Sequence, residues 1–109
     1  MPPAVQNLFD ASVESGGERV ARVADGAEFR FEHIVSNRAT SRPGFWYDQD
    51  DAEWVALVRG HATLEFDDGR LELRPGDSLL IPPHMKHRVA DTSADAVWLA
   101  LHYKKEIGS

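Results

Sequence analysis

The chain has 109 residues, of which 42% are hydrophobic, so its length fits one domain with a modest core. Its formal net charge of -6 argues against binding to nucleic acid or to an anionic membrane, because both need a basic surface. The absence of cysteine excludes disulfides, a thiol nucleophile and a thiolate zinc site.

The first stretch, residues 1–17, is weakly patterned and is predicted to form an N-terminal arm before a domain at residues 18–109. Leu8, Phe9 and Val13 could share one face of a short helical turn, packed on the domain or on a neighbouring subunit. A frayed terminus is the alternative. This segment has no signal-peptide pattern, and no apolar run has the length of a membrane span, so we expect a cytoplasmic protein.

Beyond residue 18, apolar and polar residues alternate with the period of two that indicates half-buried strands. Glycine, proline and aspartate separate the runs, and no helix of convincing length is predicted up to residue 103. The fold class is therefore all-β, a sandwich or barrel. The expected strands cover residues 20–23, 29–35, 45–47, 53–59, 62–66, 70–74, 78–81, 88–90 and 97–103.

Two strand ends carry residues that commonly bind metals. Glu53 begins a strand that is otherwise apolar, where a carboxylate is costly to bury unless it is paired or coordinated. His87 follows a strand that ends in two prolines, and an inward-facing imidazole there could bind a metal ion. The alternatives are a solvent-facing glutamate next to Asp50 and Asp51, and a histidine that forms hydrogen bonds within the core.

These residues also carry a family resemblance. Glu53 and Gly60, with six residues between them, resemble the second half of the first cupin motif, while Gly76, Pro82 and His87 resemble the second motif. The chain thus resembles a small single-domain member of the cupin superfamily over residues 43–103. This resemblance implies a single cupin-like jelly-roll β-barrel that is often a homodimer.

The site that the resemblance implies departs from the family pattern. Two histidines normally precede the glutamate, and the corresponding positions here hold Tyr47 and Gln49. The implied metal ligands are therefore Gln49, Glu53 and His87, a set suited to zinc, iron, manganese or nickel. Tyr47 is expected to line the pocket. A loop glutamine without a special role is the alternative for Gln49.

Two further histidines are candidates for the pocket. His84 stands where the family usually has glycine, and its spacing from His87 permits a shared site without requiring one. His102 lies on the last predicted strand, whose two faces are equally apolar, so the pattern does not decide whether it points inward. A surface or internally bonded histidine is the alternative for each. The three tryptophans could line a pocket, the core or an interface.

Two main functions follow from this interpretation, and a weaker third is a purely structural or regulatory dimer in which the tryptophans are interface residues. The first is a cupin that binds a divalent metal and acts on a small organic substrate, by lyase, isomerase, cyclase or dioxygenase chemistry. The second is a non-catalytic module that binds a small ligand without metal, which the loss of both motif histidines favours. Catalytic residues cannot be assigned from the sequence, because one fold hosts many reactions.

Overall fold

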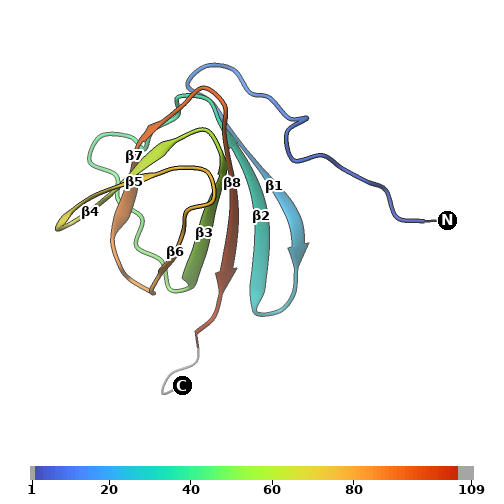
Figure 1. Ribbon diagram of the computed structural model, residues 1–109. Coiled ribbons are helices and arrows are strands. Elements are labelled where there is room, and N and C mark those ends of the chain that lie inside the picture. Colours follow the sequence, from blue (N-terminus) through green and yellow to red (C-terminus); the bar gives the residue numbers. More distant parts are fainter. Residues whose placement is uncertain (1, 106–109) are drawn as a thin grey trace.

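The computed structural model describes residues 2–105 as an all-β barrel of eight strands in two antiparallel sheets (Figure 1). The predicted arm begins at residue 1 and the predicted domain ends at residue 109. Residues 1 and 106–109 lie outside the described residues. None of the described residues belongs to a helix that could cross a membrane. The strands are β1 (Glu18–Asp25), β2 (Phe29–Ser36), β3 (Ala52–Arg59), β4 (Ala62–Phe66), β5 (Gly69–Leu73), β6 (Ser78–Ile81), β7 (His87–Thr92) and β8 (Ala96–Tyr103).

The two sheets pack face to face as a jelly-roll, which confirms the fold class that the sequence predicts. One sheet has the order β1-β2-β8-β3-β6 and the other has the order β5-β4-β7. The core between them is apolar: Leu57 of β3 and Ala96 of β8 are completely buried, and Leu64 of β4 meets them from the opposite sheet. Removing these side chains from water provides the main stabilisation of a barrel of this size.

The register of the larger sheet determines which side chains face inward. Glu53 of β3 lies opposite His102 of β8, and Ile34 of β2 lies opposite Trp98 of β8. Because directly paired residues share one face of a sheet, these four side chains project toward the interior. The structure therefore decides the inward face of β8, which the sequence pattern left open.

One local prediction was wrong. Residues 45–47 form no strand, because their only ladder contact is an isolated bridge in which Tyr47 and His87 exchange two backbone hydrogen bonds of 2.7 and 3.1 Å. The arm forms a single turn at Leu8 and Phe9, in which the backbone N–H of Asp10 donates to the carbonyl oxygen of Asn7 at 3.2 Å, and the N-terminal end of the arm extends away from the sheets (Figure 1). Phe9 is 44% exposed, and the guanidinium of Arg59 covers its ring at 4.6 Å.

Candidate functional site

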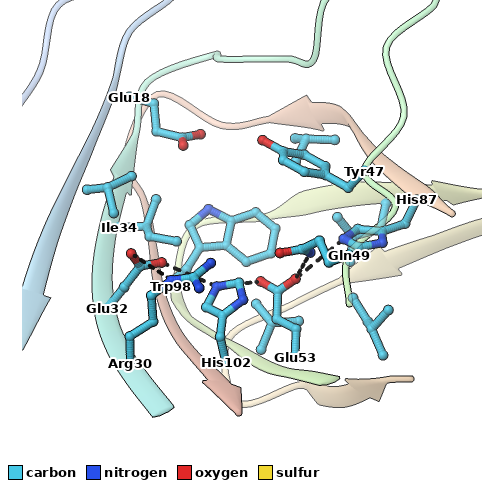
Figure 2. A pocket seen from close by; sticks show the side chains of 15 residues that line it. Glu18, Arg30, Glu32, Ile34, Tyr47, Gln49, Glu53, His87, Trp98 and His102 are labelled. Carbon is cyan, nitrogen blue, oxygen red and sulfur yellow. Dashed lines mark hydrogen bonds and ion pairs between the residues drawn. The ribbon is translucent and has the colours of Figure 1, made fainter. Parts of the chain in front are cut away.

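A pocket of about 250 Å³ opens between the two sheets, and its polar side chains gather around Glu53 (Figure 2). The larger sheet supplies most of its wall, while Tyr47 and Gln49 come from the long loop before β3. Apolar side chains from both sheets form the remainder. The lining residues are Glu18, Val20, Arg30, Glu32, Ile34, Tyr47, Gln49, Glu53, Val55, Leu64, Ile81, His87, Val89, Trp98 and His102.

The carboxylate of Glu53 lies between two imidazoles. Its Oε1 is 3.4 Å from His87 Nε2, and its Oε2 is 3.5 Å from His102 Nε2. Gln49 donates a hydrogen bond of 3.1 Å from Nε2 to Oε1. Burial by itself would raise the pKa of Glu53, but His87, His102 and Gln49 outweigh burial and lower it below the usual value. Glu53 is therefore a carboxylate at neutral pH.

The ring of His87 faces an acceptor oxygen at each of its two nitrogens. Its Nδ1 lies 2.9 Å from the carbonyl oxygen of Met85, which can only accept a hydrogen bond, so Nδ1 carries a proton. Nε2 is thereby directed at Glu53. Burial favours the neutral ring, but the bonds to Glu53 and Met85 and the charge of Glu53 raise the pKa of His87 overall. Tyr47 stacks on the ring at 5.3 Å and fixes its plane.

His102 extends this arrangement to a second carboxylate. Its Nε2 lies 3.3 Å from Glu32 Oε1 as well as 3.5 Å from Glu53 Oε2, and both oxygens are acceptors. Nε2 therefore lies between the two carboxylates. The side chain is almost fully buried, and its Nδ1 makes no hydrogen bond within residues 2–105. The result is an alternating series of Glu32, His102, Glu53 and His87 across the pocket.

The structure brings five of the six predicted site residues together. Tyr47, Gln49, Glu53, His87 and His102 all line the pocket. His84 does not, because its backbone has a φ of 62° and its ring turns to the surface. There its two nitrogens lie 2.8 Å from Asp48 Oδ1 and 3.3 Å from Asp50 Oδ1. The Asp48 contact is the main cause of the raised pKa of His84.

The sequence analysis missed three charged residues of the pocket, Glu18, Arg30 and Glu32. Arg30 and Glu32 share the inward face of β2 with Ile34, while Phe31 lies on the opposite face. The alternation along β2 was visible in the sequence, but an apolar face is normally assumed to be the inner one. In β2 the polar face, with Arg30 and Glu32, points into the pocket, and the face with Phe31 points outward.

The donor atoms suit a divalent metal in kind, but their arrangement does not form a ready cage. Imidazole, carboxylate and amide groups are all present, and the Met85 contact leaves His87 Nε2 directed at Glu53. The two oxygens of Glu53, however, are turned to different histidines. Among residues 2–105, no group of three or more histidine, aspartate or glutamate side chains has the geometry to hold an ion.

Comparison with known proteins gives a consistent family assignment. The family model described as "Cupin domain" matches residues 32–102. A solved structure from Ralstonia eutropha JMP134, with the provisional name mannose-6-phosphate isomerase, is 40% identical with a TM-score of 0.88. The match covers 94% of this chain and 100% of that one. No protein with curated function matches the chain.

More distant structures share the fold. KdgF from Halomonas sp. is 20% identical with a TM-score of 0.71, over 88% of this chain and 87% of that chain. A structure from Silicibacter pomeroyi DSS-3, described as a sugar phosphate isomerase from a cupin superfamily, is 22% identical with a TM-score of 0.67. That match covers 90% of this chain and 62% of the other. Identities this low establish the architecture alone.

Proposed function

The chain belongs to the cupin family, and from its pocket we propose that it is an enzyme that isomerises a small hydroxyl-bearing organic molecule by proton transfer. The observation that carries this proposal is the Glu53 carboxylate held between two imidazoles inside a half-enclosed cavity. The 40% identical structure with an isomerase name supports the same reaction class.

The His87–Glu53 pair has the properties of an acid–base unit. Against the effect of burial, Glu53 and Met85 raise the pKa of His87, which favours the imidazolium form that can donate a proton. The lowered pKa of Glu53 keeps it charged, so it stabilises the imidazolium form and orients the ring. Glu53 and His87 titrate as a pair, because each determines the charge preference of the other.

Isomerisation of a hydroxy carbonyl compound needs only such a pair. A base removes the proton from the carbon next to the carbonyl group, and an acid supplies a proton to the carbonyl oxygen, which gives an enediol. Reversal of these transfers at the neighbouring carbon gives the isomer, so no oxidant or reductant is consumed. In this proposal the Glu53 carboxylate is the base that removes the carbon-bound proton, the His87 imidazolium is the acid that protonates the carbonyl oxygen, and Tyr47, stacked on the His87 ring, is a positioning residue.

Deuterium exchange tests this proposal. Mannose, fructose and their 6-phosphates are incubated with the protein in D₂O, and NMR follows both interconversion and exchange of the proton next to the carbonyl carbon. We expect exchange with the wild type, and a loss of about 100-fold or more in Glu53→Gln and His87→Asn. His61→Asn is the matched control, because His61 is an exposed turn residue outside the pocket. Absence of exchange in the wild type would contradict the isomerase assignment.

A metal-dependent form of the same site is the second candidate. The Met85–His87 contact favours it, because a metal-binding histidine usually donates its other ring proton to such a carbonyl. Gln49, Glu53 and His87 would be the ligands, and zinc, iron, manganese or nickel would polarise a substrate oxygen. Elemental analysis of protein purified without an affinity tag tests it. Stoichiometric metal that is lost in His87→Asn is the expected result, and metal-free protein that takes up no added ion would exclude it.

A further inference from the structure

The charges of the pocket define its substrate class more narrowly than the family does. We infer that the pocket takes an unphosphorylated polyhydroxyl or amino-sugar ligand, and that Glu18 with Ser36 and Tyr47 forms a second binding point opposite Glu53. This inference rests on the proposed function and specifies its substrate. It differs from the sugar phosphates after which two similar structures are named, because it is argued from the charges of this pocket.

The basic groups of the pocket are already paired with carboxylates. Three carboxylates line it, those of Glu18, Glu32 and Glu53, and its basic side chains are Arg30, His87 and His102. Arg30 is engaged, because its Nε lies 3.6 Å from Glu32 Oε2 and its Nη1 lies 3.7 Å from Asp51 Oδ2. The two imidazoles lie against Glu53 and Glu32. A phosphate group would therefore meet the negative charge of Glu18, which forms no salt bridge within residues 2–105, without a lining cation that is not already paired.

The end of the pocket opposite Glu53 is built for hydroxyl groups. The Glu18 carboxylate and the Tyr47 ring face each other across it (Figure 2). The phenol hydroxyl of Tyr47 is a hydrogen-bond donor directed toward the Glu18 side of the pocket (Figure 2). A carboxylate acceptor beside a phenol donor matches a hydroxyl group, which both donates and accepts. The same carboxylate would also accept an ammonium group.

An unsatisfied hydroxyl at this end points to a ligand. Ser36 is only 1% exposed and lies behind the pocket wall, and its Oγ makes no hydrogen bond of standard geometry within the described part of the chain. The Ser36 side chain nevertheless acts on the Glu18 carboxylate, because burial raises the pKa of Glu18 and Ser36 lowers it by a smaller amount. Ser36 pairs across the ladder with Glu18, and it lies two residues after the pocket residue Ile34, so its side chain shares their face. Buried hydroxyls are rarely left without a partner, and a ligand hydroxyl near Glu18 would supply one.

The wall between the two ends suits the body of a sugar. Trp98 and Ile34 lie between the Glu18 end and the Glu53 end (Figure 2). Together with Val55 and Leu64 they offer an apolar surface to ring C–H groups. The pocket thus alternates polar, apolar and polar surfaces, which is the pattern that a neutral sugar presents along its own length.

Three ligands that differ in charge test the inference: mannose, mannosamine and mannose 6-phosphate. Dissociation constants come from ¹H–¹⁵N NMR titrations of wild type, Glu18→Gln, Ser36→Ala and Glu72→Gln. Glu72 is exposed on β5 outside the pocket, so Glu72→Gln changes the net charge equally and serves as the control. We expect mannose 6-phosphate to bind the wild type at least about tenfold more weakly than mannose. The ratio of the two dissociation constants should become smaller in Glu18→Gln and should stay the same in Glu72→Gln. Ser36→Ala is expected to weaken mannose binding.

Three results would contradict the inference. Equal or tighter binding of mannose 6-phosphate would do so, including binding at the neighbouring hollow lined by Arg22, Arg30 and Lys104. In that case the proposed isomerase function stands, because deuterium exchange tests it separately. A ratio that Glu18→Gln leaves unchanged would exclude the second binding point. If none of the three ligands shifts pocket amides, both the inference and the sugar isomerase function fail.

Discussion

At the residue scale, the properties of the site come from contacts between side chains rather than from burial. Burial alone would raise the pKa of Glu53 and lower that of His87, since it penalises their charged forms. Their mutual contact reverses both shifts, together with His102 and Gln49 for Glu53 and the Met85 carbonyl for His87. Each residue therefore favours its charged form more than burial alone would allow.

This coupling predicts how stability depends on pH. The pKa of His87 is raised above 6.5 in the native state, so its contribution to stability is complete below that pH and is lost as pH rises through the native value. The pKa of Glu53 is lowered below 4.5, so its contribution is complete above that pH and is lost in more acidic buffer. The part of stability due to this pair should therefore be greatest between pH 4.5 and 6.5.

Urea unfolding across this range, with NMR titration of the histidine ring protons, checks the expectation. Glu53→Gln should lower the titration midpoint of His87, because it removes the charge that stabilises the imidazolium. The control is His61→Asn, which leaves the pair intact. A stability profile that is the same in wild type and Glu53→Gln would contradict the coupling.

At the scale of elements, two turns of the barrel need glycine for different reasons. Gly60, between β3 and β4, has a φ of 79°, and Gly76, before β6, has a φ of 94°. Both conformations are unfavourable for other residues. A Cβ at Gly60 would also clash with Ser93 Oγ and lie 3.0 Å from Ala96 Cα, whereas a Cβ at Gly76 would meet nothing within 4 Å.

Alanine at each glycine separates the two effects. Gly76→Ala should cost about 1–2 kcal/mol of unfolding free energy through backbone strain alone. Gly60→Ala should cost a further 1–3 kcal/mol, roughly the penalty of overpacking, because Ser93 and the backbone of Ala96 must move. Chemical denaturation of the two variants measures the difference. Equal losses would show that the close approach at Gly60 carries no energetic weight.

At the scale of the whole molecule, the larger sheet presents an apolar surface on its outer side. One row across it pairs Phe31 of β2 with Leu101 of β8, Leu101 with Trp54 of β3, and Trp54 with Leu80 of β6. Leu80 is 48% exposed. The other three side chains are half-buried, so the row is a partly exposed apolar strip, which favours association of two copies through the same surface.

We therefore expect a homodimer with twice the 12.2 kDa mass of the chain in light scattering. Leu80→Glu should shift it toward the monomer, because it introduces a charge at the proposed interface. Val5→Glu is the companion variant, since Val5 is 97% exposed in the arm and would report pairing through the arm instead. A mass of 12.2 kDa at all concentrations would contradict pairing through either surface.

The sequence by itself determined the all-β fold, most of the strands and, with the family resemblance, Tyr47, Gln49, Glu53 and His87 as candidates for the pocket. These features are local: alternation with period two, turn residues between the runs, and a carboxylate and an imidazole at the ends of apolar strands. Glu53 and His87 could be found because the surrounding glycines and prolines mark where their strands begin and end.

Only the tertiary structure decided how these residues meet. The inward direction of His102, and the entry of Glu18, Arg30 and Glu32 into the pocket, depend on the register between strands distant in the chain. The surface position of His84 depends on a positive φ and on Asp48, 36 residues away. A strand sequence specifies two faces but not which face the rest of the barrel covers, and that choice is made by packing.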